Sequence, residues 1–192
     1  DKWSYYVISH SSGTTTLYID GSSVGSSTGS AFSSIEASSV QNLMVAGRQG
    51  GSSSEFAKMK IRDFHLKSEA HNGAVNSEPA TSDSNTLILA AHKPYLAAQT
   101  GTSTALAPSV NNAVSVSPTS PYDYSEYASG TNGGSVHFDG SDYFQLSATA
   151  TDLLPETSNT TIEAWVNTTG TGHVSVFSNF NPSSPYNGME VG

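Results

Sequence analysis

The sequence predicts an all-β protein built from antiparallel strands in two packed layers. Several short segments alternate strictly between apolar and polar residues, as strands do when successive side chains point to opposite faces. Ser and Thr together make up roughly a quarter of the chain, which suits strands and turns better than helices. No stretch shows the spacing of an amphipathic helix, so we expect strands throughout.

The first half of the chain holds four candidate strands, at residues 3–10, 14–19, 43–47 and 61–66. In the second of them, Leu17 and Ile19 fall on one face of the strand. Asp20 and Gly21 follow and tolerate the positive φ angles of a tight turn. We therefore predict a β-hairpin that continues through Val24.

The middle of the chain is rich in Ser, Ala and Thr, and short strands are predicted there at residues 86–90 and 113–116. Residues 135–146 then predict a second hairpin, because alternating Val136 and Phe138 lead into the turn dipeptide Asp-Gly.

The remaining strands lie near the end of the sequence. In the strand predicted at 160–167, apolar positions alternate with the positions of Glu163 and Trp165, which therefore share the opposite face. Residues 174–177 and 189–191 predict two further short strands.

Two groups of motifs carry a family resemblance. The first half contributes the segments at 3–10, 43–47 and 61–66, and the second half contributes Phe-Asp-Gly at 138–140 and Ile-Glu-Ala-Trp at 162–165. Together they resemble the laminin G-like, concanavalin A-like domains repeated in virion proteins of marine cyanobacterial phages. The resemblance implies a jelly-roll β-sandwich whose closing strands precede its opening strands, as if the chain were cut out of phase from a tandem array.

The domain organisation follows from this split order. We expect residues 1–78 to be the closing half of one module and residues 79–192 the opening half of the next, or of a permuted module. Residues 79–132 are then a Ser-, Ala- and Pro-rich connecting segment with short strands. Because a sandwich needs all its strands to bury both inner faces, the halves are expected to meet in one sandwich or in adjacent ones.

Composition argues against several classes of partner. The net charge is −9 and Lys93 is the last basic residue, so nucleic acid is not an expected partner. No run of about 18 apolar residues exists, so no membrane insertion is expected. The chain has no Cys, which excludes a disulfide framework and a thiol nucleophile.

Carbohydrate binding needs an aromatic ring to stack on a sugar and polar groups to fix its hydroxyls. The candidate ligand-binding residues are Trp165, Glu163, Tyr18, Tyr143 and Tyr186. The alternative for Trp165 is a buried position in which its indole N–H donates to an acceptor such as Glu163.

Metal binding has one candidate place. Asp139 and Asp142 lie in one tight loop and are candidate calcium ligands; the alternative is that Asp139 only makes the turn. No other cofactor is expected. The six histidines lack metal-binding spacing and are predicted to have surface or rim roles: His10, His65, His71, His92, His137 and His173.

The resemblance implies a non-catalytic module of a repetitive virion or extracellular protein, such as a tail fibre, that binds host-surface polysaccharide. The alternative is a purely structural module that spaces or decorates an assembly through contacts with neighbouring modules or copies of itself. An enzyme is the weakest alternative, because glycoside hydrolases need two carboxyl groups and Glu163 has no carboxylate two residues away on its strand.

Overall fold

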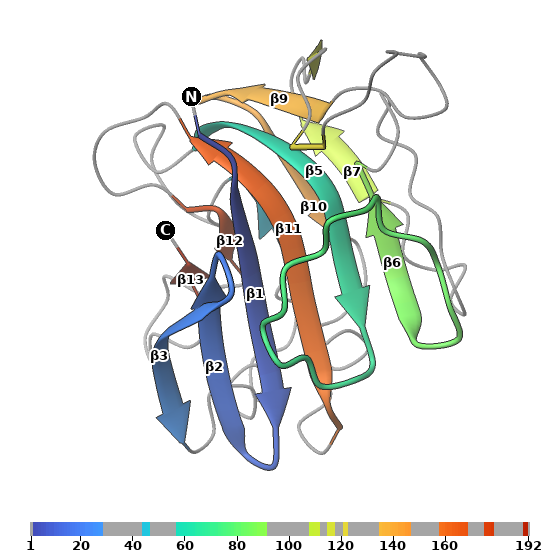
Figure 1. Ribbon diagram of the computed structural model, residues 1–192. Helices are drawn as coiled ribbons and strands as arrows, with labels where there is room; N and C mark the ends of the chain where they lie inside the picture. The colour runs from blue at the N-terminus through green and yellow to red at the C-terminus, as the bar shows by residue number, and fades with distance from the viewer. Residues whose placement is uncertain are drawn as a thin grey trace, which may run out of the picture.

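The computed structural model describes residues 2–28, 44–46, 57–91, 108–111, 115–117, 121–122, 135–146, 158–168, 175–178 and 190–191. Every regular element in these ranges is a β-strand, and every strand pair is antiparallel (Figure 1). The all-β, antiparallel class predicted from the sequence is confirmed. These ranges contain no helix of the length and apolar character that crossing a bilayer requires.

The larger sheet contains eight strands: β1 (Ser4–Ser11), β2 (Thr14–Ile19), β3 (Ser22–Thr28), β5 (Lys58–Lys67), β6 (Thr86–Ala90), β8 (Ser115–Ser117), β9 (Ser135–Asp139) and β11 (Thr160–Thr168). Their order is β3-β2-β1-β11-β5-β9-β8, and β6 also pairs with β5. Strand β11 comes from the second half of the sequence, yet it lies between β1 and β5 from the first half (Figure 1). The two halves of the chain therefore pair within one sheet.

The smaller sheet contains β4 (Met44–Val45), β7 (Pro108–Asn111), β10 (Tyr143–Leu146), β12 (Phe177–Ser178) and β13 (Glu190–Val191), in the order β13-β12-β4-β10-β7. One apolar core joins the sheets. The ring of Phe64 on β5 lies 5.4 Å from that of Phe144 on β10 and 5.7 Å from that of Phe177 on β12. The apolar face predicted for β11 lies in this core, with Ile162 and Ala164 fully buried.

The first predicted hairpin is confirmed and the second is wrong. Asp20 and Gly21 adopt φ angles of 49° and 83° between β2 and β3. Strands β9 and β10, however, belong to different sheets, and Phe138 and Phe144 meet at 5.9 Å inside the core. The Asp139-Gly140 turn leads the chain from the larger sheet to the smaller one. The prediction failed because a turn dipeptide indicates where the chain turns but not which sheet the next strand joins.

A β-bulge at Asp63 changes the alternation of β5. The register to β11 shifts between Glu163 and Trp165, and Asp63 has a φ of 52°. Ile61 and Phe64 therefore both reach the core, although they are three residues apart. The bulge also puts both Arg62 and His65 on the outer face of the sheet, opposite Trp165 and Glu163.

Residues 68–85, which connect β5 to β6, cross the outer face of the larger sheet (Figure 1), and we call them the strap. Hydrogen bonds attach the strap to β1, β11 and β5. The N–H of His71 donates to Ser9 Oγ at 2.9 Å, Thr161 Oγ1 donates to the Glu69 carbonyl at 2.7 Å, and the N–H of Ala80 donates to Asp63 Oδ2 at 3.1 Å. The segment around residue 78, where a module boundary was expected, is part of the strap.

Candidate functional site

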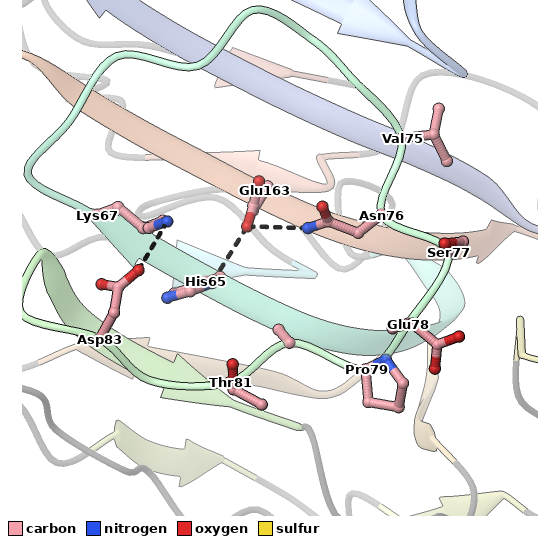
Figure 2. Close-up of a pocket in the computed structure, with 11 residues that line it drawn as sticks. His65, Lys67, Val75, Asn76, Ser77, Glu78, Pro79, Thr81, Asp83 and Glu163 are labelled. Atoms are coloured by element: carbon pink, nitrogen blue, oxygen red, sulfur yellow. Dashed lines mark hydrogen bonds and ion pairs between the residues drawn. The ribbon is translucent and has the colours of Figure 1, made fainter.

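The strap, β5 and β11 line an open pocket of about 360 Å³ on the outer face of the larger sheet (Figure 2). Its polar groups come from His65 and Lys67 on β5, from Glu163 on β11, and from the strap, which contributes Asn76, Glu78 and Asp83 among others. None of the described lining residues is Phe, Tyr or Trp. The pocket therefore offers charged groups of both signs and amide groups, but no aromatic platform.

Glu163 lies at the floor of the pocket and is only 2% exposed. Its Oε2 accepts a hydrogen bond from the Tyr5 hydroxyl at 2.7 Å and lies 3.4 Å from His71 Nε2. Its Oε1 lies 3.1 Å from His65 Nδ1 and accepts from Asn76 Nδ2 at 3.4 Å. Hydrogen bonds from Tyr5 and Asn76 and close contacts with His65 and His71 therefore surround the carboxylate with groups from β1, β5 and the strap.

These donors keep the carboxylate ionised in spite of its burial. Burial raises the pKa of Glu163, but the contact with His65 and the hydrogen bond from Tyr5 outweigh it, and the pKa lies below its ordinary value. Burial and the neighbouring Glu163 raise the pKa of Tyr5, so its hydroxyl stays protonated and continues to donate.

The local geometry fixes the tautomer of His71. Its Nδ1 accepts the main-chain N–H of Gly73 at 2.8 Å, so this nitrogen carries no proton. The proton is therefore on Nε2, which faces Glu163. The strap thus presents an imidazole whose Nε2 lies 3.4 Å from the buried carboxylate.

A second chain of polar contacts runs from the floor of the pocket to its end. His65 Nε2 lies 2.8 Å from Thr86 Oγ1, and the Thr86 hydroxyl donates to Asp83 Oδ1 at 3.1 Å. Lys67 Nζ pairs with Asp83 Oδ2 at 3.2 Å and with Glu69, and Figure 2 shows the Lys67–Asp83 pair beside His65. The groups at this end are therefore held in place by one another.

Beside the pocket, Asp63 ties three parts of the chain together. Its Oδ1 accepts from Arg62 Nε at 3.1 Å, and its Oδ2 accepts from the Tyr122 hydroxyl at 2.6 Å. Burial raises the pKa of Asp63, although Arg62 and Tyr122 oppose this shift. The ring of Tyr122 meets Trp165 edge-on, with centroids 6.1 Å apart, and Tyr5 lies 5.1 Å from Trp165 on the same sheet.

The structure brings some of the candidate ligand-binding residues together. Glu163, Trp165 and Tyr18 all lie on the outer face of the larger sheet, where Tyr18 packs over Gly73 of the strap. Trp165 is half-buried beside two tyrosines, and Glu163 accepts from Tyr5 in place of the indole. Tyr143 is half-buried in the smaller sheet, and Tyr186 lies outside the described residues.

The carboxylates proposed for calcium serve the turn between β9 and β10. Asp139 Oδ1 accepts from the hydroxyl of Ser141 at 2.7 Å and from its N–H at 2.8 Å, and these bonds lower the pKa of Asp139. Asp142 is 1% exposed, and its Oδ2 accepts from the N–H of Asp139 at 3.2 Å. Within the described ranges, no group of three or more His, Cys, Asp or Glu residues could hold a metal ion.

Sequence reasoning missed most partners of Glu163. The surface or rim role predicted for the histidines is wrong for His65 and His10, which are 2% and 4% exposed. Strict alternation along β5 gives no reason to place His65 opposite Glu163, because the bulge at Asp63 sets that register. Nothing in the strap's sequence signals that His71 and Asn76 cover a sheet.

Comparison of the chain with protein-family models, with curated protein sequences and with solved structures finds no match. The function has therefore to be argued from the residues of the site itself.

Proposed function

We propose that the chain is a non-catalytic β-sandwich module that binds carbohydrate in the pocket beneath the strap. The observation that carries the proposal is the pocket of about 360 Å³, lined by charged and amide groups. Small-ligand sites occupy about 300–1,000 Å³. Sugar hydroxyls both donate and accept hydrogen bonds, which matches a lining that contains Lys67, Asn76 and Glu78.

The network in the floor of the pocket supports binding because its polar groups are held in place by other groups of the protein. Asn76 is held by Tyr5 and Glu163, and Lys67 by Asp83 and Glu69. Groups that are already fixed lose little entropy when a ligand arrives. With no Phe, Tyr or Trp ring in the described lining, each site is expected to bind weakly, and many copies would act together through multivalency.

The same network supports a non-catalytic role. A general acid or base must exchange a proton with its substrate. Glu163 accepts from Tyr5 on Oε2 and from Asn76 on Oε1, and Asp83 accepts from Thr86 and pairs with Lys67. These contacts favour positioning of a ligand over hydrolysis.

The wider setting that we propose is a jelly-roll module, laminin G-like in type, in a virion or extracellular appendage that touches host-surface glycans. Two antiparallel sheets around one core, with the two halves of the chain joined at β1, β11 and β5, support this fold. The competing role is a module that only spaces an assembly and contacts copies of itself.

A glycan array with the whole chain tests the proposal, followed by titration of the best glycan. The variant Ser77→Ala/Thr81→Ala removes two hydroxyls from the pocket, and Ser26→Ala/Thr28→Ala removes two from exposed strand β3. We expect at least about tenfold weaker binding for the first variant, since a hydrogen bond contributes about 1 kcal/mol, and unchanged binding for the second. Absence of any enriched glycan would favour the spacing role, and release of reducing sugar would contradict the non-catalytic one.

A further inference from the structure

Residues 71–74 of the strap hold an Asn-Gly pair between a base and a hydrogen-bond donor. The main-chain N–H of Gly73 donates to His71 Nδ1 at 2.8 Å. The main-chain N–H of Ala74 donates to the side-chain oxygen of Asn72, Oδ1, at 3.0 Å. Asn72 itself is exposed. We propose that this arrangement makes Asn72 a self-modification site, at which the chain converts its own asparagine to aspartate and isoaspartate.

The two hydrogen bonds meet the requirements of the reaction. The nucleophile is the main-chain nitrogen of Gly73, which must lose its proton, and the unprotonated Nδ1 of His71 already contacts that proton. The electrophile is Cγ of Asn72, whose oxygen gains negative charge during attack. The N–H of Ala74 points at that oxygen and stabilises the charge.

The steps balance without any further reactant except water. The Gly73 nitrogen bonds to Cγ of Asn72 as its proton passes to His71 Nδ1. The bond from Cγ to Nδ2 then breaks, the proton on His71 passes to the departing nitrogen, and ammonia leaves into solvent. Water opens the resulting succinimide ring at either carbonyl, which gives aspartate or isoaspartate at position 72.

Glu163 acts on this reaction through His71, as a positioning residue. Its Oε2 lies 3.4 Å from His71 Nε2, on the far side of the ring from Gly73. A buried carboxylate in that place holds the tautomer with a free Nδ1 and stabilises the imidazolium formed by proton transfer. The residue that anchors the strap thereby also activates the base within it.

The product changes the contact between the strap and strand β2. Gly73 has a φ of 84°, and its Cα lies so close beneath the Tyr18 ring that a Cβ could not fit. Isoaspartate inserts an extra methylene into the main chain just before this glycine. The modified strap is therefore expected to hold less tightly to the sheet, whether or not the pocket binds a sugar.

Peptide mass spectrometry after incubation at neutral pH tests the proposal. The sequence has three Asn-Gly pairs. Those at Asn132 and Asn187 lie outside the described residues, and their conversion is measured in the same sample for comparison. We expect Asn72 to convert at least about tenfold faster in the folded protein than in the urea-unfolded chain, because a placed general base contributes about 10²-fold or more. A folded rate equal to or below the unfolded rate would overturn the proposal.

The variant His71→Gln distinguishes the role of His71 as a general base from a purely structural role. Glutamine retains an oxygen that can accept the Gly73 N–H, but it cannot take up the proton. We expect the rate at Asn72 in this variant to fall to that of the unfolded chain, and the rate in Glu163→Gln to fall in the same direction, while the melting curve reports whether each variant is folded. If folded His71→Gln keeps the native rate, the catalytic role of His71 is wrong. The comparison of folded and unfolded wild-type chains needs no variant.

Discussion

At the residue scale, the site depends on one buried carboxylate. Glu163 interacts with Tyr5 on β1, His65 on β5 and Asn76 in the strap, so one side chain joins two strands and the segment that covers them. Removing one member of a buried, hydrogen-bonded charge pair leaves the others unsatisfied. The stability of the strap should therefore depend on the charge of Glu163.

We predict that Glu163→Gln lowers the free energy of unfolding by about 3–5 kcal/mol at neutral pH, the range for breaking a buried pair. Glu78→Gln makes the same chemical change on an exposed pocket residue, and it should change stability by less than about 0.5 kcal/mol. Urea unfolding of the three proteins measures the difference. Equal stabilities for the two variants would show that the network around Glu163 contributes nothing.

The pH dependence of stability should change with the same substitution. Because the folded pKa of Glu163 lies below its ordinary value of 4.5, its contribution is fully present above pH 4.5 and is lost as the pH falls through the folded pKa. Wild type should therefore lose more stability than Glu163→Gln on acidification below pH 4.5. The raised pKa of Asp63 acts in the opposite direction, but it is common to both proteins and cancels in the difference.

At the element scale, the strap determines what the outer face of the sheet can do. Its turn at Gly73 rests on Tyr18, and its ends lie at β5 and β6. Strand β2 beneath it and strand β6 after it were predictable, because Leu17 and Ile19 alternate with polar residues and residues 86–90 are mostly apolar. The strap was not predictable, because its apolar residues have no regular spacing that would indicate which surface it covers.

Three glycine substitutions separate backbone strain from packing at this turn. Gly73→Ala faces both a φ of 84° and the Tyr18 ring, and we predict a loss of about 3 kcal/mol. Gly13→Ala has a φ of 73° but nothing within 4 Å, and a loss of about 1 kcal/mol is expected. Gly25→Ala has open space and no positive φ, so its stability should stay within about 0.5 kcal/mol. If thermal unfolding showed equal losses of stability for Gly13→Ala and Gly73→Ala, the contact with Tyr18 would contribute nothing to stability.

At the scale of the whole molecule, the site exists because strands from the two ends of the sequence lie side by side. The all-β class and the placement of Glu163 on the strand face opposite Ile162 followed from alternation, which is local. The passage of the chain from one sheet to the other at Asp139 and the bulge at Asp63 could not be predicted from alternation. Each depends on how a strand pairs with strands distant in the sequence. Those two non-local features decide which residues surround Glu163.

An engineered disulfide between β1 and β11 tests this pairing most directly, since the chain has no Cys of its own. Ser9 and Thr161 are opposite partners whose side-chain oxygens are 3.4 Å apart, whereas Asn167 lies six residues further along β11. Ser9→Cys/Thr161→Cys should oxidise to an intramolecular disulfide, detected as a linked peptide in a non-reducing digest of the monomer. Ser9→Cys/Asn167→Cys should remain reduced. A linked control pair, or an unlinked Ser9–Thr161 pair in a folded protein, would contradict the joining of the two halves in one sheet.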